Sequence, residues 1–226
     1  MELWIEGSID QVEVAVGTGI VQAVATNPAI MARWTANGQS MEQVVTEACR
    51  RVNVPIYVQL HGPTIDHYLR EMDYLRGISD QIHPKLVSTL EGISAAKRLM
   101  QDGYKPLITT ISTVNQAFMA AVAGVPYIAP YVGRIADAGV DVARLLENIA
   151  NLYVRHGVQT KIAAASIRTP EQAEQALLAG SHIIVTQYEV FTRLFDGELS
   201  QNWIDRFEEN WRQFSFAGRV DEKVTP

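Results

Sequence analysis

Short apolar segments alternate with longer amphipathic ones along most of the 226-residue chain. Brief apolar runs are typical of strands, and apolar positions that recur every three or four residues are typical of helices. The pattern predicts eight strands, at Leu3–Glu6, Ile20–Ala25, Pro55–Leu60, Gln81–Val87, Leu107–Ile111, Pro126–Val132, Lys161–Ala165 and His182–Val185. It predicts a helix after each strand, at Asp10–Val16, Met41–Val52, Ile65–Leu75, Thr89–Gln101, Val114–Ala123, Val140–His156, Pro170–Ala179 and Val190–Leu194. A last amphipathic helix, Gln201–Phe214, stands outside the repeat.

The predicted strands are apolar throughout rather than alternating, as in Ile162-Ala163-Ala164-Ala165. Parallel sheets that are covered by helices have this composition. Eight strand–helix units joined by short turns therefore predict an α/β fold, a single (β/α)8 TIM barrel at residues 1–198. Residues 199–226 are expected to add a C-terminal helix and tail to the same domain. An open doubly wound sheet is the alternative, but it usually has a glycine-rich loop after its first strand, and Glu6-Gly7-Ser8 is no such loop.

The composition limits the class of protein and its partners. At 47% hydrophobic and 19% charged residues the chain can bury a full core. Its 25 acidic and 19 basic residues, with no basic block, argue against nucleic acid and anionic membranes as partners. The longest apolar stretch, 117–132, contains Gly124, Pro126 and Pro130 and is not expected to cross a membrane. Cys49 is the single cysteine and no signal-peptide pattern is present, so we expect a cytoplasmic location.

Polar residues stand at the carboxyl ends of seven successive predicted strands. They are Glu6, Thr26 with Asn27, Gln59, Lys85, Thr109, Tyr131 and Ser166. In a barrel of parallel strands these ends meet at one mouth, where the active sites of such barrels lie. Each residue alone has an ordinary structural explanation, such as a turn for Asn27 or a strand preference for Thr109. Their convergence on one mouth predicts a functional site.

Lys85 is the most informative of these residues because it lies inside a predicted buried strand, although a surface loop is the alternative. Desolvation disfavours an ammonium group, and the neutral amine is the nucleophile of Schiff-base chemistry on carbonyl substrates. Strand alternation places His83 on the same face as Lys85. Pro84 cannot donate to a strand ladder, so we expect a bulge or distortion beside the lysine. No His, Cys or Asp grouping has metal-ligand spacing, and neither a metal nor a cofactor is expected.

Two arginines follow the sixth and seventh predicted strands. Arg134 comes after the sixth strand, and Arg168 comes after the seventh, just before a helix start at Thr169. Many barrels of this type hold phosphate in the loops after the last strands, together with a helix N-terminus. Arg134, Ser166 and Arg168 therefore form a candidate anion site. The alternative is that both arginines are solvated loop residues.

Taken together, these residues resemble the fructose-6-phosphate aldolase branch of the transaldolase family, from Met1 to about Phe214. No single segment would suffice, but the combination is specific. The resemblance lies in Met1-Glu2-Leu3, Ala25-Thr26-Asn27-Pro28, Gln59, Lys85 with Glu91-Gly92, Tyr127-Ile128-Ala129-Pro130-Tyr131-Val132 with Arg134-Ile135, Ala164-Ala165-Ser166, and Phe207-x-x-x-Trp211.

The resemblance implies a class I aldolase, in which a lysine forms a Schiff base with the substrate. Lys85 would form this imine, while neighbouring side chains position a water and move protons. The residues implied in catalysis are Lys85, Glu6, Tyr131 and Gln59. The residues implied in substrate binding are Asn27, Thr26, Thr109, Arg134, Ser166 and Arg168.

The implied reaction is reversible aldol cleavage of a ketose phosphate, such as fructose 6-phosphate, to dihydroxyacetone and an aldehyde phosphate. Gln59 and Tyr131 resemble the aldolase branch, because transaldolases typically carry Glu and Phe at these places. A transaldolase that transfers a dihydroxyacetone unit between sugar phosphates is the alternative. Glu6 replaces the Asp of the family, and His83-Pro84 replaces apolar residues, which leaves open a different carbonyl substrate or a binding role alone.

The resemblance also implies a homo-oligomer, a pentamer or decamer, because the family forms ring-like assemblies in which the C-terminal helix docks on a neighbour. Trp203, Phe207 and Trp211 recur every four residues and suit that role. Packing of this helix on its own barrel is the alternative. The expected partners are therefore small sugar phosphates, ketones or aldehydes, and further copies of the chain.

Overall fold

The structure is a computed structural model that describes residues 1–213. The chain groups into two units, Met1–Phe191 and a second that begins at Thr192. The predicted helix end at Phe214 and the tail at 214–226 lie outside the described residues. Placing the extra helix and the barrel in one domain stays a prediction.

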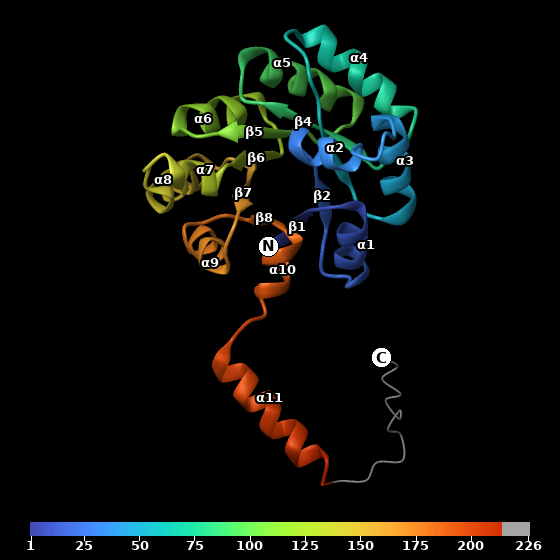
Figure 1. The fold of residues 1–226 in the computed structure, drawn as a ribbon. Coiled ribbons are helices and arrows are strands. Elements are labelled where there is room, and N and C mark those ends of the chain that lie inside the picture. Colours follow the sequence, from blue (N-terminus) through green and yellow to red (C-terminus); the bar gives the residue numbers. More distant parts are fainter. Residues whose placement is uncertain (214–226) are drawn as a thin grey trace. The chain divides into compact units, whose positions relative to one another are not determined.

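Eight parallel strands close into a barrel in the first unit, which confirms the predicted (β/α)8 architecture (Figure 1). Each strand pairs with the next along the chain, and the last pairs with the first. The strands are β1 (Glu2–Glu6), β2 (Ala23–Ala25), β3 (Ile56–Gln59), β4 (Ile82–Val87), β5 (Leu107–Ile111), β6 (Tyr127–Pro130), β7 (Lys161–Ile167) and β8 (Ile183–Gln187).

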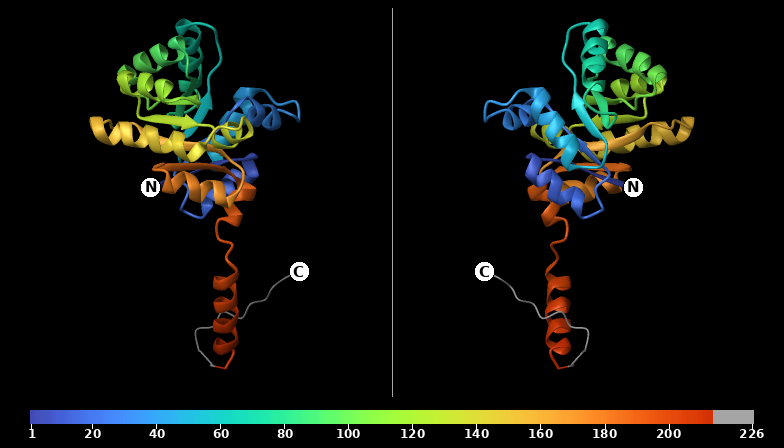
Figure 2. Two further views of the ribbon diagram at one scale, coloured as in Figure 1. Left: turned by 90° about the vertical axis from the view of Figure 1, so that its left-hand side faces the viewer. Right: turned by 90° about the vertical axis from the view of Figure 1, so that its right-hand side faces the viewer.

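Helices lie around the barrel and beside its mouth (Figure 2). They are α1 (Ile9–Gly17), α2 (Pro28–Trp34), α3 (Met41–Arg51), α4 (Ile65–Arg76), α5 (Leu90–Leu99), the 3-10 turn η1 (Met100–Asp102), α6 (Val114–Ala123), α7 (Val132–Asp137), α8 (Val142–His156), α9 (Pro170–Leu178) and α10 (Tyr188–Arg193). The second unit contains α11 (Glu198–Trp211). Within residues 1–213 no helix combines the length and the apolarity needed to cross a lipid bilayer.

Two short helices, α2 and α7, were not predicted. Helix α2 begins because the Asn27 side chain caps it by accepting from the Ile30 N–H at 3.0 Å, with Pro28 at the first helical position. The apolar pattern places Val132 in the sixth strand, but β6 ends at Pro130 and α7 starts at Val132. Both helices therefore follow directly after strand ends at the barrel mouth.

The register beside Lys85 is regular, so the predicted bulge at Pro84 is wrong. Strands β3 and β4 pair without a shift, with Val58 opposite Pro84 and Gln59 opposite Lys85. The ladder between β4 and β5 begins at Lys85 and Leu107, one residue after Pro84. This ladder therefore does not need the N–H that Pro84 lacks, and the register stays unshifted.

The register shifts lie instead near the carboxyl ends of β5 and β7. The β5–β6 ladder shifts between Ile108 and Ile111, and the β7–β8 ladder shifts around Ser166. Among residues 1–213, Thr110 and Ser166 are the non-glycine residues with positive φ, at 62° and 58°. This backbone conformation costs about 1–3 kcal/mol for a residue with a side chain and is concentrated at functional sites. The strain thus marks the strand end that carries Ser166.

An aromatic layer of Trp4, Tyr57 and Tyr127 fills the barrel interior. Trp4 stacks on Tyr57 with ring centroids 4.5 Å apart, and Tyr127 meets both rings edge-on. Because alternate residues of a strand share a face, Trp4 lies on the same face as Glu6, and Tyr57 on the same face as Gln59. The aromatic layer is therefore the floor beneath the strand-end residues.

Trp4→Ala is expected to lower the free energy of unfolding by about 3–5 kcal/mol, because it removes a side chain that is 1% exposed and leaves a cavity in the floor. The control is Phe118→Ala, an aromatic on α6 that is 49% exposed and should change stability by about 0.5 kcal/mol or less. Urea denaturation measures both values. Equal losses in the two variants would contradict the packed floor.

Helix α11 exposes an apolar stripe. None of its residues is buried, and the large apolar side chains are each at least 49% exposed. The stripe consists of Leu199, Trp203, Ile204, Phe207 and Trp211. Exposed apolar patches of this kind usually mark an interaction surface.

Candidate active site

The Lys85 amine lies inside the barrel, where the side chain is 1% exposed. Its Nζ donates to the main-chain oxygen of Thr26 at 2.8 Å and lies 3.9 Å from Oε1 of Glu6. The same nitrogen is 5.9 Å from the centroid of the Tyr131 ring. Because these neighbours come from the ends of β1, β2 and β6, the amine lies in the interior rather than on a surface loop.

Glu6, the last residue of β1, is 7% exposed. Burial raises the pKa of its carboxyl group above the usual value, because desolvation disfavours the charged form. Several influences oppose this rise: the charges of Lys85, Arg134 and Arg33, and a hydrogen bond with the side chain of Asn27. Burial thus favours the protonated form of this carboxyl group, which lies beside the amine with which it can exchange a proton.

Two buried polar atoms on the strands that flank β4 have no hydrogen-bond partner within the described part of the chain. They are Oε1 of Gln59, the residue opposite Lys85 on β3, and Oγ1 of Thr109 on β5. The main-chain N–H of Gln59 donates to Thr26 Oγ1 at 3.4 Å. Buried polar atoms normally have partners, so these two are available to a water or a substrate hydroxyl.

His83 lies on β4 two residues before Lys85, where its ring contacts the aromatic layer. Its ring centroid is 5.6 Å from that of Tyr57, and its Nδ1 accepts from the Lys105 N–H at 3.5 Å. Burial and then the charge of Lys105 lower the pKa of the imidazole, which favours its neutral form. Within residues 1–213 no group of three or more His, Cys, Asp or Glu side chains is arranged to hold a metal ion.

A cavity of about 180 Å³ lies at the carboxyl ends of the strands. It is lined by Glu6, Asn27, Ala29, Ile30, Arg33, Tyr131, Arg134, Ser166, Ile167, Arg168 and Gln187. Six of the ten predicted site residues are among these: Glu6, Asn27, Tyr131, Arg134, Ser166 and Arg168. The other four, Thr26, Gln59, Lys85 and Thr109, do not line it. Glu6 and Tyr131 belong to the cavity and also lie near the amine.

Three arginines face this cavity, and they differ in their partners. Arg168 is paired, because its Nη1 donates to both carboxylate oxygens of Asp137 at 3.0 and 2.8 Å. The guanidinium carbon of Arg134 lies 5.1 Å from the centroid of the Tyr131 ring. Arg33 projects from α2. The cavity is therefore rich in positive charge.

Gly133 lets α7 approach the end of β7. A Cβ at this position would lie 2.6 Å from the main-chain oxygen of Ser166 and 2.8 Å from Nε of Arg168. Real Cβ atoms essentially never come this close, so any side chain here would displace α7 or the strand end. Glycine is thus required for the cavity wall that Ser166 and Arg168 form.

Sequence reasoning missed two polar residues that line the cavity, Arg33 and Gln187. Arg33 was missed because α2 was not predicted, although Asn27-Pro28 is a helix-start signal and would have placed Arg33 three residues after Ile30 on one face. Gln187 was missed because the predicted eighth strand ended at Val185, whereas β8 continues to Gln187.

Glu6→Gln is expected to raise the melting temperature at neutral pH, because it removes a carboxylate whose ionisation burial disfavours. The folded-state pKa of Glu6 lies above its unfolded value, so the folded protein binds this proton more tightly. The stability that the folded protein gains from binding this proton is therefore lost as the pH rises from the pKa of Glu6 in the unfolded chain through its higher pKa in the folded protein.

Thermal unfolding of parent and Glu6→Gln over a pH series measures this effect. The two melting temperatures should converge at low pH, where Glu6 is protonated, and separate as the pH rises. A Gln variant that melts below the parent at neutral pH would show that the ionised carboxylate is a net stabilising group.

Comparison with known proteins points to one family. Residues 6–224 match the family described as Transaldolase/Fructose-6-phosphate aldolase. A probable transaldolase of Pelotomaculum thermopropionicum is 35% identical over 214 residues, which cover 94% of this chain and 98% of that protein. A probable transaldolase of Carboxydothermus hydrogenoformans is 32% identical over 213 residues, which cover 94% of this chain and 98% of that protein. A probable transaldolase of Streptococcus equi subsp. zooepidemicus is 34% identical over 196 residues, which cover 87% of this chain and 90% of that protein.

A solved structure resembles the fold alone. The thiamine phosphate pyrophosphorylase of Pyrococcus furiosus superposes with a TM-score of 0.50 over 82% of this chain and 85% of that one. The two sequences are only 16% identical. This likeness therefore concerns the barrel and not the chemistry of the site.

Proposed function

The chain belongs to the transaldolase and fructose-6-phosphate aldolase family, and within this family we propose that it is a class I aldolase whose Lys85 forms the Schiff base. The observation that carries the proposal is the buried Lys85 amine, 3.9 Å from the Glu6 carboxyl group. A buried amine is the nucleophile that carbonyl chemistry needs, and an adjacent carboxyl group supplies the proton transfers. The proposed substrate is a ketose phosphate such as fructose 6-phosphate.

The proposed reaction begins when the neutral Lys85 amine attacks the ketone carbon of the substrate. Loss of the carbonyl oxygen as water leaves an iminium ion. The carbon–carbon bond one carbon away from the iminium carbon then breaks. The hydroxyl on the departing carbon gives up its proton and becomes the aldehyde, so the aldehyde phosphate is released and an enamine stays on the lysine. Protonation of the enamine and addition of water release dihydroxyacetone and restore Lys85.

The surrounding residues supply proton transfer and orientation in this scheme. Glu6 and Tyr131 are the proton carriers, because both line the cavity and lie near Nζ of Lys85. The unpartnered buried oxygens of Gln59 and Thr109 bind a water or substrate hydroxyls. The remaining substrate-binding residues proposed are Thr26, Asn27, Arg134, Ser166 and Arg168.

Lys85→Met is expected to abolish both turnover and covalent trapping of a ketone donor. With dihydroxyacetone present, borohydride reduces the iminium to a stable secondary amine, so mass spectrometry of the parent should find the adduct on the peptide that contains Lys85. The control is Lys97→Met, an exposed lysine on α5, which should be trapped like the parent. Parent protein that stays unmodified, while an active class I aldolase is labelled, would contradict the proposal.

Transfer of a dihydroxyacetone unit between sugar phosphates is a second candidate, because the curated relatives are named probable transaldolases. The two reactions differ only in the reaction partner of the enamine. In the aldolase the enamine takes up a proton, and in the transaldolase it adds to an acceptor aldehyde. Gln59 and Tyr131 favour the aldolase, since the resemblance associates Glu and Phe at these places with transaldolases. An assay of dihydroxyacetone release with and without an acceptor aldose phosphate separates the two. Ligand-induced stabilisation without turnover would indicate a binding role instead.

We also propose that the protein is located in the cytoplasm. Cys49 is a free cysteine and the chain has no other, so no intrachain disulfide contributes to its stability. This composition suits a reducing compartment.

We propose in addition that the chain forms homo-oligomers through the apolar stripe of α11. Phe207→Glu is expected to lower the assembled mass, because it places a charge at the centre of a stripe that would be buried between copies. Light scattering after size-exclusion chromatography measures this mass. Gln201→Glu, on the polar side of the same helix, is the control and should leave it unchanged. A parent protein that elutes as a monomer would contradict the assembly.

A further inference from the structure

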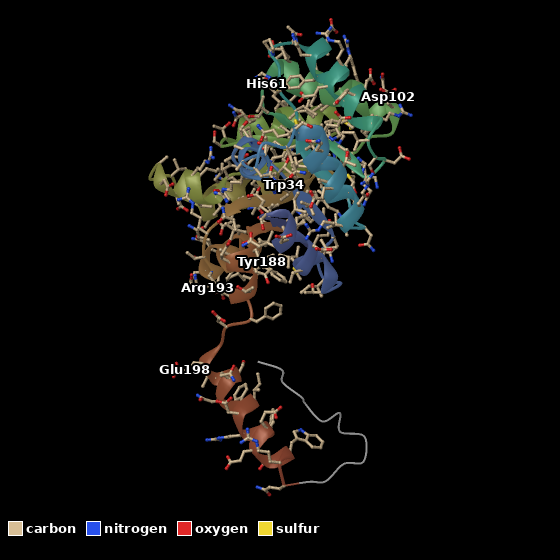
Figure 3. The ribbon with its side chains drawn as sticks, turned by 45° about the vertical axis from the view of Figure 1, so that its right-hand side comes forward. Trp34, His61, Asp102, Tyr188, Arg193 and Glu198 are labelled. Atoms are coloured by element: carbon tan, nitrogen blue, oxygen red, sulfur yellow. The ribbon has the colours of Figure 1, made fainter. Side chains whose placement is uncertain are left out.

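Helix α2 is fixed over the barrel mouth and carries Arg33. Its first turn is capped by Asn27, and its inner face packs through Ile30 and Trp34, which are 4% and 6% exposed. Figure 3 labels Trp34 within the barrel unit. Its indole N–H donates at 2.9 Å to the main-chain oxygen of Gly7, the residue after Glu6. Arg33 therefore projects from an anchored helix and not from a loose loop.

Arg33 and Arg134 line the same cavity from opposite sides of the barrel mouth. Helix α2 follows β2 and α7 follows β6, and these strands are four positions apart in a closed ring of eight. The cavity that both side chains line has a volume of about 180 Å³. Because both side chains border this one cavity, an anionic group bound in it has both guanidinium groups among its surroundings.

These two arginines also carry the unneutralised charge of the cavity. Arg168 is paired with both carboxylate oxygens of Asp137. Neither Arg33 nor Arg134 forms an ion pair with any residue in the range 1–213. Both act on the Glu6 carboxyl group through their charge, which places them near the reacting end of the cavity. A guanidinium group offers a planar fork of N–H donors that matches a phosphate.

We propose that Arg33 is a specificity-determining residue that binds the phosphate of the substrate together with Arg134. Arg168 contributes less, because Asp137 already engages its guanidinium. The phosphate thus spans the mouth between α2 and α7, instead of lying only against the loops after β6 and β7. The identity of the phosphate ester, an aldehyde phosphate, rests on the proposed function, but the binding of phosphate by Arg33 does not.

The first test is direct binding of inorganic phosphate at constant ionic strength, measured by calorimetry. Arg33→Gln is expected to weaken binding about 10- to 100-fold, since it removes a charge-assisted contact. Arg134→Gln should weaken it similarly and Arg168→Gln less. Arg70→Gln, an exposed arginine on α4 that does not line the cavity, is the matched control and should bind like the parent. Melting temperatures without phosphate show whether each variant is folded.

The second test compares an aldehyde with its phosphate ester as acceptors in the aldol direction. Arg33→Gln is expected to lower the ratio of kcat/KM for glyceraldehyde 3-phosphate to that for glyceraldehyde by about 10- to 100-fold. Arg70→Gln should leave this ratio unchanged. A ratio that falls only for Arg168→Gln would assign the phosphate to the β7 loop and overturn the role of Arg33.

The two tests separate this inference from the proposed function. A parent that binds phosphate through Arg33 but shows no aldol turnover would contradict the aldolase and support the anion site. A parent that runs the aldol reaction, with Arg33→Gln binding phosphate as tightly as the parent, would overturn the inference and leave the aldolase standing. A parent that binds no phosphate also overturns it.

Discussion

Burial of the Lys85 amino group is the constraint that the rest of the site must satisfy. The amine makes one direct hydrogen bond, to the main-chain oxygen of Thr26, and Glu6 stands 3.9 Å away. Burying an amine and a carboxyl group costs desolvation free energy, so such an arrangement persists only where the fold holds both groups in place. A closed barrel does this, because β1, β2 and β4 belong to one closed sheet and the aromatic layer fills the space below.

The mouth of the barrel, which contains the buried amine, divides into a reacting centre and a binding cavity. Lys85, Gln59 and Thr109 lie inside, where polar atoms without partners can meet a substrate. The cavity lies over β1, β2 and β6 to β8, and the short helices α2 and α7 supply two of its walls. These walls depend on local backbone features: the positive φ of Ser166 and the absence of a side chain at Gly133. The strained backbone at Ser166 and the absence of a Cβ at Gly133 therefore determine the shape of the cavity wall.

Much of this arrangement could be predicted from the sequence, for a physical reason. In a parallel barrel every strand delivers its last residue to the same mouth, so reading strand ends amounts to reading the site, and Lys85, Glu6 and Tyr131 indeed lie together. Helices α2 and α7 are too brief to show a helical period, so only a start signal such as Asn27-Pro28 before α2 can indicate them. The ion pair of Arg168 with Asp137 joins residues 31 positions apart, and no local pattern indicates it.

The error at Pro84 shows a different limit of sequence reasoning. A proline in a strand does remove a donor, but the consequence depends on whether a neighbouring strand needs that donor. Here the β4–β5 ladder begins only at Lys85, and that register is set by the packing of the whole barrel. Propensity rules describe a residue, whereas the effect of the residue on a sheet is decided by its partners.

Glu6 connects the reacting centre to the binding cavity, and this gives its burial a functional meaning. Arg33 and Arg134 help to keep the pKa of Glu6 from rising further, against the effect of burial. A phosphate bound between these arginines, as proposed, offsets their charges, so the pKa of Glu6 in the complex is higher than in the free protein. A higher pKa favours the protonated carboxyl group, which is the form that delivers a proton to the oxygen that leaves as the iminium forms. Substrate binding and proton supply are coupled through one carboxyl group in this arrangement. A side chain long enough to reach both the amine and the cavity is what such coupling requires.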